Sequence, residues 1–540
     1  MLGIFLVILL TAVTNQPVGN AGSIEYRQFQ KGMTYVAWWH DTYVTAESDQ
    51  SIQFLAETDA NWVAIIVTWY QDTYTDSSVK PDADRTPTDA SLMHAIQMIH
   101  RLGMSIMLKP HVDLLESERW RGEIEPRNEK AWFDSYRAFI THYAELAEDN
   151  NVEMLSIGTE LNSMTQRGYT AYWLEIIDAI RRVYDGELTY AANWWPNSAW
   201  QDLGFLKELN YLGIDAYFPL TEKKDPTIFE LKKAWQPWVS QIEAWQKVSG
   251  KQVILTEVGY RDLDGANIRP WDWQIEGSQD QQEQADCYQA ALETFWGKPW
   301  LHGIFWWAWT YEQLPLDYTP WGKPSEAILR AWYAKPFIPD GTQSDAVPSL
   351  VAIQRAEDAI RRAYREDRTR GLDAAKRTLA ESIDAYRRSS FVESEALATA
   401  AKKTADDTVN QQKYEEANNL VNQALRTVNG LRNVTLQSGD SVNFKQQAED
   451  ELATATDALA RNDLENAKLH ANSSIQLAER ALSAERNYSE AFQAREAAAV
   501  AQQQVQNRIL TYALVAAIIA LLVVLAAYAI RKRNRRLTRP

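Results

Sequence analysis

The stretch QVILTEVGY, residues 252–260, is an apolar run that ends on a carboxylate, Glu257, just before a turn at Gly259. Its apolar residues are continuous rather than alternating with polar ones, which is typical of a strand buried on both faces of a parallel sheet. Such a strand seldom carries a charge, because a buried charge is costly unless it has a partner. Glu257 is therefore a candidate functional residue, and a second group is expected to accompany it.

Eight apolar runs of this kind, separated by segments with helical periodicity, occur between residues 24 and 335. They are MTYVAWW (33–39), WVAIIVTWY (62–70), MSIMLKPHVD (104–113), VEMLSIGTEL (152–161), LTYAANWW (188–195), YLGIDAYFPL (211–220), QVILTEVGY (252–260) and HGIFWWAWT (302–310). Strands that alternate with helices predict a parallel sheet, and eight such units predict a (β/α)8 TIM barrel over residues 24–340. A doubly wound open sheet is the alternative, but it usually carries a Gly-rich phosphate loop after its first strand, and the sequence has none there.

Tryptophan marks a boundary in the chain. All 22 tryptophans lie between Trp38 and Trp332, and the residues that follow are rich in Ala, Gln, Asn, Glu and Arg. Residues 346–508 are typical of helices throughout, with narrow Ala-rich faces that suit antiparallel hairpins or coiled coils. We expect an all-α helical stalk that spaces the barrel from a membrane, with self-association through the stalk as a further expectation.

Both ends of the chain carry targeting signals. Residues 1–21 contain an apolar run followed by small residues, which is typical of a signal peptide; a short N-terminal anchor is the alternative, since no Lys or Arg precedes the run. Residues 509–530 form an uncharged span of 22 residues, long enough to be a transmembrane helix. Six basic residues follow in the tail 531–540, and the positive-inside rule places such a tail in the cytoplasm. We expect a single-pass cell-membrane protein whose catalytic domain is extracellular or periplasmic.

Charge and cysteine content exclude several function classes. The net charge of −17 argues against a nucleic-acid partner, because phosphate contacts need clustered Lys and Arg. It is compatible with a neutral substrate such as a sugar polymer. The single cysteine, Cys287, allows neither an intrachain disulfide framework nor a zinc–thiolate site. We expect no cofactor and no metal.

In a barrel of this type, catalytic groups sit at the carboxyl ends of the strands. The ends of the predicted strands form a ring that comprises Lys109, His111, Asp113, Glu160, Asn193, Trp194, Trp195, Asp215, Tyr217, Glu257, Trp306, Trp307 and Trp309. Trp307 and Trp309 share a face by strand alternation, so both are expected to face the cleft. His111 and Asp113 alone provide too few ligands for a metal.

Two carboxylates across a cleft are what glycosidic cleavage requires. One donates a proton to the departing oxygen, and the other attacks the anomeric carbon or activates water. Glu160 alone would be interpreted as a strand-end carboxylate in a salt bridge. The positions of Glu160 and Glu257 on the fourth and seventh of eight strands, among aromatic residues that suit sugar rings, favour catalysis instead.

Glutamates at these two strand ends resemble the large clan of retaining (β/α)8 glycosidases. The stretches KPHVD (109–113), WRGEI (120–124), GTEL (158–161), DAYFPL (215–220) and TEVGYR (256–261) together resemble glycoside hydrolase family 113, the β-mannanase family, over roughly residues 24–335. Most clan members have Asn before the acid/base glutamate, whereas Thr159 stands there in this chain, which affects the contact expected at the substrate 2-hydroxyl.

The resemblance implies a role for each matching residue. Glu160 would be the acid/base, Glu257 the nucleophile, and Tyr217 a hydrogen-bond donor to the nucleophile. The residues expected to bind sugar are Lys109, His111, Asp113, Trp120, Arg121, Asn193, Trp194, Trp307 and Trp309. The function expected is that of a retaining endo-β-glycanase acting on β-1,4-linked mannan. The alternatives are action on another β-glycan, a non-catalytic carbohydrate-binding or structural surface protein, and a main role in the helical region with the barrel as a display domain.

Overall fold

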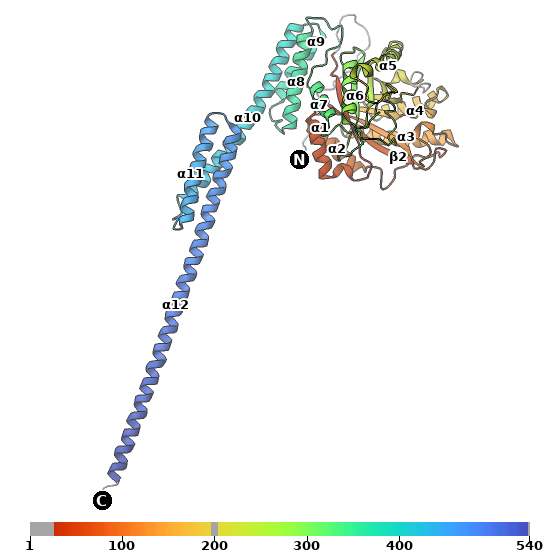
Figure 1. Ribbon diagram of the computed structural model, residues 1–540. Helices are drawn as coiled ribbons and strands as arrows, with labels where there is room; N and C mark the ends of the chain where they lie inside the picture. Colours follow the sequence, from red (N-terminus) through yellow and green to blue (C-terminus); the bar gives the residue numbers. More distant parts are fainter. Residues whose placement is uncertain (1–25, 196–202, 538–540) are drawn as a thin grey trace. The chain divides into compact units, whose positions relative to one another are not determined.

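The structure is a computed structural model that describes residues 26–195 and 203–537 (Figure 1). The chain divides into two compact units, Met1–Val409 and Asn410–Pro540, and helix α10 (Phe391–Leu431) contributes to both. The predicted signal peptide lies outside the described residues. The predicted division into a barrel domain over 24–340 and a stalk over 346–508 stays a prediction.

The first unit contains a closed barrel of eight parallel strands that pair in the order of the sequence. The strands are β1 (Gln30–Tyr35), β2 (Trp62–Gln71), β3 (Ser105–Leu114), β4 (Met154–Thr159), β5 (Glu187–Asn193), β6 (Leu212–Asp215), β7 (Val253–Val258) and β8 (Leu301–Trp309). Each strand overlaps one of the eight apolar runs, so the predicted TIM barrel is confirmed.

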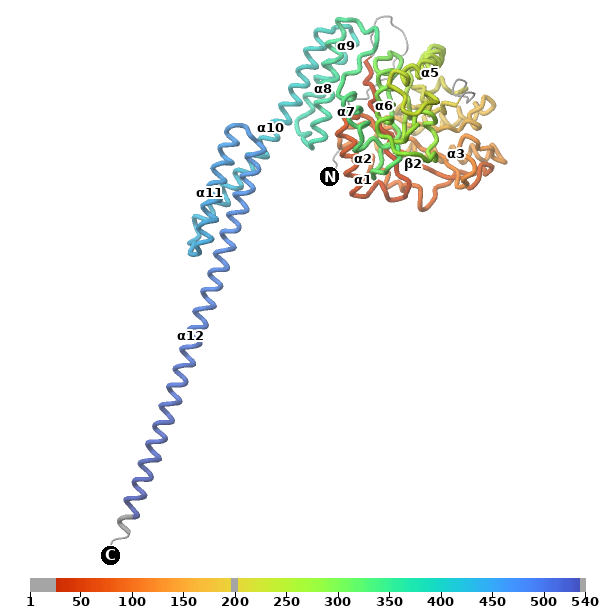
Figure 2. The backbone as a smooth tube through the Cα atoms, viewed as in Figure 1, coloured from red at the N-terminus to blue at the C-terminus, as the bar shows by residue number. Residues whose placement is uncertain are grey.

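An α-helix follows each strand except β5, which among the described residues is followed by the short 3-10 helix η6 (Leu206–Glu208) (Figure 2). The α-helices are α1 (Ala46–Ala56), α2 (Asp89–Arg101), α3 (Glu129–Asp149), α4 (Thr170–Arg181), α5 (Ile228–Ser249), α6 (Gln281–Phe295) and α7 (Pro324–Tyr333). Several begin at side chains that cap the helix: Thr45, Thr88, Asn128 and Asp280 each accept a hydrogen bond from the N–H three residues later.

Side chains of the strands alternate between two buried layers. On β2, Trp62 and Ala64 belong to the cluster inside the barrel, whereas Val63 and Ile65 belong to the larger core under the helices. The other members of the inner cluster are Met107, Met154, Tyr211, Ile254 and Phe305. The end of the barrel where the strands begin is therefore a packed core. The polar residues gather at the other end, where the strands finish.

The alternation breaks near the carboxyl ends of β4, β7 and β8, where the strand ladder shifts register. Such a bulge re-aims the side chains that follow it. On β7, Ile254 points into the barrel, so strict alternation would turn Glu257 outward. The bulge returns Glu257 to the interior and leaves the next residue, Val258, in the outer core.

Helices α8 (Val347–Arg365) and α9 (Asp373–Arg387) belong to the first unit and share a core with Tyr26 and the start of α10. Gln354 on α8 joins them to the barrel, because it donates to Phe337 O at 2.9 Å and accepts from Phe337 N at 2.7 Å. Arg365 donates to Asp59 Oδ1 at 2.8 Å. These two helices therefore pack on the barrel unit.

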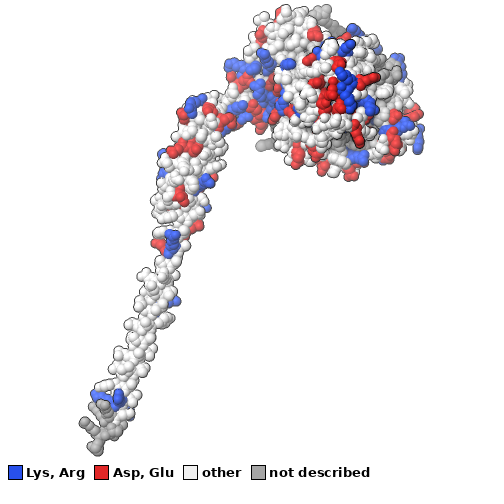
Figure 3. Space-filling model, viewed as in Figure 1, with Lys and Arg blue, Asp and Glu red and all other residues white. Residues whose placement is uncertain are grey.

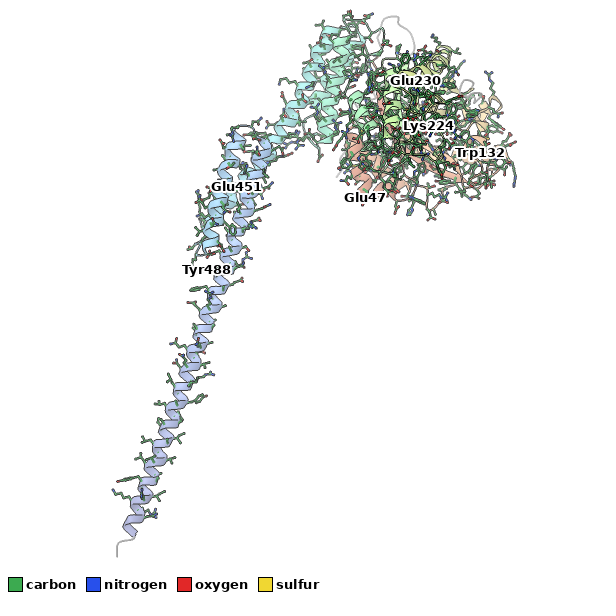
Figure 4. The ribbon with its side chains drawn as sticks, viewed as in Figure 1. Glu47, Trp132, Lys224, Glu230, Glu451 and Tyr488 are labelled. Atoms are coloured by element: carbon green, nitrogen blue, oxygen red, sulfur yellow. The ribbon has the colours of Figure 1, made fainter. Side chains whose placement is uncertain are left out.

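In the second unit, α11 (Gly439–Ala460) lies against the first part of α12 (Leu464–Leu537) (Figure 4). Buried alanines such as Ala455 and Ala471 let the helices approach closely, and His470 pairs with Glu451 at 2.6 Å. From residue 486 to 534 every side chain of α12 is exposed. Much of this part of the helix is free of charge up to its basic end (Figure 3). By length and composition α12 is a candidate membrane span.

Candidate active site

Glu160 follows β4 directly and is held from β5. Its backbone N–H donates to Ala191 O at 2.9 Å, and its Oε1 accepts a hydrogen bond of 2.5 Å from Asn193 Nδ2. Burial raises the pKa of Glu160; the Arg121 guanidinium opposes this rise, and the Glu257 carboxylate adds to it. A carboxyl group with a raised pKa is suited to hold a proton and donate it.

Glu257 lies at the end of β7 and is only 5% exposed. Its Oε2 accepts a hydrogen bond of 2.7 Å from the Tyr217 hydroxyl, and its Oε1 accepts one from Lys109. Burial and the Glu257 charge raise the pKa of Tyr217 well above its ordinary value, so the phenol keeps its proton and donates it. Glu257 is therefore oriented by one neutral and one charged donor, an environment unlike that of Glu160.

The Lys109 ammonium lies between two carboxylates. Its Nζ donates to Asp215 Oδ1 at 3.0 Å and to Glu257, and Thr256 Oγ1 also donates to Asp215 Oδ1, at 2.8 Å. Burial lowers the pKa of Lys109, but Asp215 and Glu257 together more than compensate and raise it. The Lys109 side chain is 0% exposed. Both carboxylate contacts of Lys109 are internal, and its predicted contact with sugar stays a prediction.

His111 presents a donor next to Glu257. Its Nδ1 lies 3.0 Å from Arg121 Nη1, and because a guanidinium only donates, the neutral imidazole carries its proton on Nε2. Burial and the cations Arg121 and Lys109 lower the pKa of His111 well below its ordinary value. Nε2 lies 4.0 Å from Glu257 Oε1 and has no hydrogen-bond partner among the described residues. This N–H is therefore a buried donor beside Glu257.

Strand β3 and the connection after it hold three further predicted residues. Asp113 Oδ2 lies 3.4 Å from Arg121 Nη2, so the guanidinium joins Asp113 to His111. Trp120 is 40% exposed. Gly122 permits this arrangement, because a Cβ at that position would lie 2.3 Å from the Trp120 ring. The connection therefore places an exposed indole next to a charged donor.

Trp307 and Trp309 lie in different layers, which corrects the prediction for Trp309. The Trp307 ring is parallel to His111, with centroids 6.3 Å apart, and contacts Trp38 at the same centroid distance. Trp309 is fully buried, stacks on Trp321 and donates to Ser51 Oγ at 3.0 Å. The bulge on β8 sets Met33 and Tyr35 opposite Trp306 and Trp309, so one extra residue on β8 reverses the alternation.

Two tryptophans follow Asn193, and the predicted contact of Trp194 with sugar stays a prediction. Trp194 is 4% exposed and packs among the aromatic residues Phe218, Trp238 and Trp271. The next residue, Trp195, is 52% exposed, and its backbone N–H donates to Asn193 Oδ1 at 2.8 Å. Trp195 is therefore the exposed aromatic of this pair, and it is joined to Glu160 through Asn193.

Two residues of this region had no predicted role. Asp215 is a fully buried carboxylate in the apolar stretch LGID, and such a charge in a strand signals a cationic partner. Trp38 is 41% exposed at the end of the first apolar run. The double tryptophan of VAWW was the available signal for it.

Among the described residues, three carboxylates outside this cluster have oxygen atoms close enough together to share a cation. They are Asp225, Asp280 and Glu283. Both oxygens of Glu283 already accept hydrogen bonds, among them those from Gly265 N at 2.8 Å and Asn267 Nδ2 at 2.8 Å. Glu283 therefore organises the connections around the start of α6.

Comparisons with known proteins found a family model and solved structures that are similar to this chain. The model of Glycoside Hydrolase Family 113 matches residues 33–322. A complex of a family 113 β-1,4-mannanase is 26% identical, with a TM-score of 0.52, and the match covers 57% of this chain and 100% of that chain. The family 113 β-mannanase from Alicyclobacillus acidocaldarius in complex with ManMIm has the same identity and TM-score, with 57% of this chain and 98% of that chain covered. No curated protein matches the chain.

Proposed function

Because the chain belongs to glycoside hydrolase family 113, we propose that this glycoside hydrolase is a retaining endo-β-mannanase that cleaves β-1,4-linked mannan-type polysaccharide. The observation that carries the proposal is the contrast between the two glutamates. Glu160 has a raised pKa and accepts from an amide, whereas Glu257 accepts from an ammonium and a phenol. The similar solved structures are described as β-mannanases, which supports mannan as the substrate.

The proposed reaction is a double displacement. Glu160 donates its proton to the glycosidic oxygen while Glu257 attacks the anomeric carbon and forms a glycosyl ester. Glu160, now ionised, then takes a proton from water as the water oxygen attacks the same carbon and releases Glu257. Tyr217 and Lys109 hold the carboxylate of Glu257, and Asn193 holds Glu160.

Sugar recognition is proposed to come from the carboxyl ends of β3, β5 and β8 and from the connection after β3. The His111 N–H and the charged pair of Arg121 and Asp113 would bind hydroxyls on the side of Glu257. Trp307 and Trp120 would stack on sugar faces. Asn193 would bind a hydroxyl near Glu160.

We propose that the catalytic unit acts at a membrane surface. Residues 509–530 of α12 are uncharged and exposed, and Arg531, Lys532 and Arg533 follow them. Such a span flanked by basic residues suits a single-pass anchor with a cytoplasmic carboxyl end. Removal of residues 509–540 should transfer the protein from the membrane fraction to the soluble fraction.

The substrate and the mechanism are tested together by incubating the purified protein with a panel of β-mannan, β-glucan and β-xylan. We expect cleavage of β-mannan into oligosaccharides, with the β-anomer of the new reducing end appearing first in proton NMR. Initial release of the α-anomer would exclude retention. Cleavage of β-glucan or β-xylan instead of mannan would exclude the proposed substrate but leave the mechanism intact.

A further inference from the structure

We propose that Asp215 is a positioning residue that keeps the Lys109 ammonium charged while Glu257 is esterified, so that Lys109 can stabilise the carboxylate that water releases. This inference rests on the proposed double displacement. Its geometric basis is the buried row of Asp215, Lys109 and Glu257, in which Nζ donates to both carboxylates. Asp215 accepts from Thr256 as well, which fixes its orientation.

The charge of Glu257 changes during the reaction. In the first step an electron pair of its carboxylate forms a bond to the anomeric carbon, the bond from that carbon to the glycosidic oxygen breaks, and this oxygen takes the proton of Glu160. Glu257 is then an uncharged ester. In the second step a water oxygen bonds to the anomeric carbon, Glu160 takes a proton from that water, and the electron pair of the ester bond returns to Glu257 as negative charge.

Lys109 therefore faces two carboxylates in the free enzyme but only one, Asp215, in the intermediate. The ammonium and Asp215 are both 0% exposed, so water does not replace the lost charge. A buried lysine without a counter-charge readily loses its proton. Asp215 at 3.0 Å prevents this loss, and the ammonium is then in place when negative charge returns to Glu257.

The other charged groups of the site do not supply this counter-charge. His111 of β3 is held neutral by burial and by Arg121 and Lys109. Arg121 is itself a cation. Glu160 ionises in the intermediate, but its described hydrogen bond is to Asn193. Burial and the Glu257 charge raise the pKa of Asp215 well above its ordinary value, and the Lys109 ammonium opposes this rise. Esterification of Glu257 removes the larger of the two carboxylate contributions, so the intermediate favours ionised Asp215, the carboxylate that then remains in contact with Lys109.

The test separates the two chemical steps in the full chain. With a 2,4-dinitrophenyl β-mannobioside the first step is fast, so the burst of dinitrophenolate reports ester formation and the steady state reports ester hydrolysis. We expect Asp215→Asn to leave the burst rate within a few-fold of wild type and to slow hydrolysis about 100-fold, the loss typical of one electrostatic stabiliser. Intact-protein mass spectrometry should show the glycosyl ester accumulating.

The pH profile distinguishes this role from a structural one. The rate of ester hydrolysis should fall as the pH rises. In Asp215→Asn this fall should occur at a lower pH than in wild type, because the less stabilised Lys109 ammonium loses its proton at a lower pH. Asp262→Asn is the matched control: Asp262 is also fully buried and lies 3.1 Å from a lysine, Lys323, so the variant should lose stability but keep the wild-type profile.

A second variant keeps the test decisive if Asp215→Asn does not fold. The double variant Lys109→Met/Asp215→Asn removes both charges together, and it should hydrolyse the ester slowly without the shifted alkaline limb. Wild-type hydrolysis in the double variant would overturn the proposal, as would equal losses in both steps of Asp215→Asn. Absence of activity on every β-mannoside in the wild type would instead overturn the proposed function.

Discussion

Asn193 Nδ2 donates a hydrogen bond of 2.5 Å to Glu160 Oε1, and this bond favours the ionised carboxylate. Burial raises the pKa of Glu160, and the hydrogen bond from Asn193 lowers it. The amide therefore limits how strongly the proposed acid retains its proton.

In Asn193→Ala the pKa of Glu160 should rise further. Glu160 must be protonated for the first step, so kcat/KM falls as pH rises through this pKa, and the alkaline limb should move to higher pH in the variant. Loss of orientation should also lower kcat/KM about 10-fold or more at the optimum. The measurement is kcat/KM against pH on one soluble manno-oligosaccharide.

Asn162→Ala is the control, because Asn162 lies in the same connection, two residues after Glu160. It should keep the wild-type alkaline limb. An unchanged limb in Asn193→Ala, or a shift to lower pH, would contradict the proposed effect of the amide on Glu160.

Tyr217→Phe should lower kcat about 10- to 100-fold with little loss of stability. The variant removes the 2.7 Å hydrogen bond to Glu257 Oε2 but keeps the ring, so the proposed nucleophile loses one of its two orienting donors. Tyr318→Phe is the matched control, because its hydroxyl donates to Pro270 O at 2.7 Å rather than to a glutamate. Equal losses of kcat in the two variants would argue against a specific role for Tyr217.

The two tryptophans of β8 should separate binding from stability. Trp307→Ala should raise KM for manno-oligosaccharides, because the ring beside His111 borders the site. Trp309→Ala should instead destabilise the fold by about 3–5 kcal/mol, the usual cost of removing a buried aromatic side chain. Thermal unfolding and Michaelis kinetics on both variants check this, and a raised KM in Trp309→Ala without loss of stability would refute the assignment.

The barrel could be predicted because each strand is locally encoded as a continuous apolar run. The same runs predicted that Glu160 and Glu257 lie at strand ends, and the structure places them there. The orientation of Trp309 could not be predicted, because it depends on a bulge formed against β1, more than two hundred residues away in the sequence. A strand's own sequence carries the period of two, but the bulge arises in the pairing.

The role of Lys109 was missed for a related reason. Its partners Asp215 and Glu257 are 106 and 148 residues away, so its burial is a property of the closed barrel. A lysine next to a predicted cleft is equally consistent with a sugar contact. The cue that could have been used is the charge balance, since two carboxylates in buried strands require a cation.

The catalytic unit should need α8 and α9 to be stable, although the tryptophan-rich region ends before them. A chain that stops at residue 340 loses the Gln354 hydrogen bonds to both backbone groups of Phe337, and the Arg365 contact with Asp59. It also exposes Tyr26 and the apolar core that Tyr26 shares with α8. Such a chain should unfold at a lower temperature than one that stops at residue 409.

The matched point variant is Gln354→Ala in the full chain, which removes only the two hydrogen bonds to Phe337. It should cost about 1–3 kcal/mol, because a buried N–H and C=O lose their partners. Thermal unfolding of the three proteins, with hydrolysis followed in parallel, gives the comparison. Equal unfolding temperatures for the chains ending at 340 and 409 would show that α8 and α9 are dispensable and that the barrel alone is the stable unit.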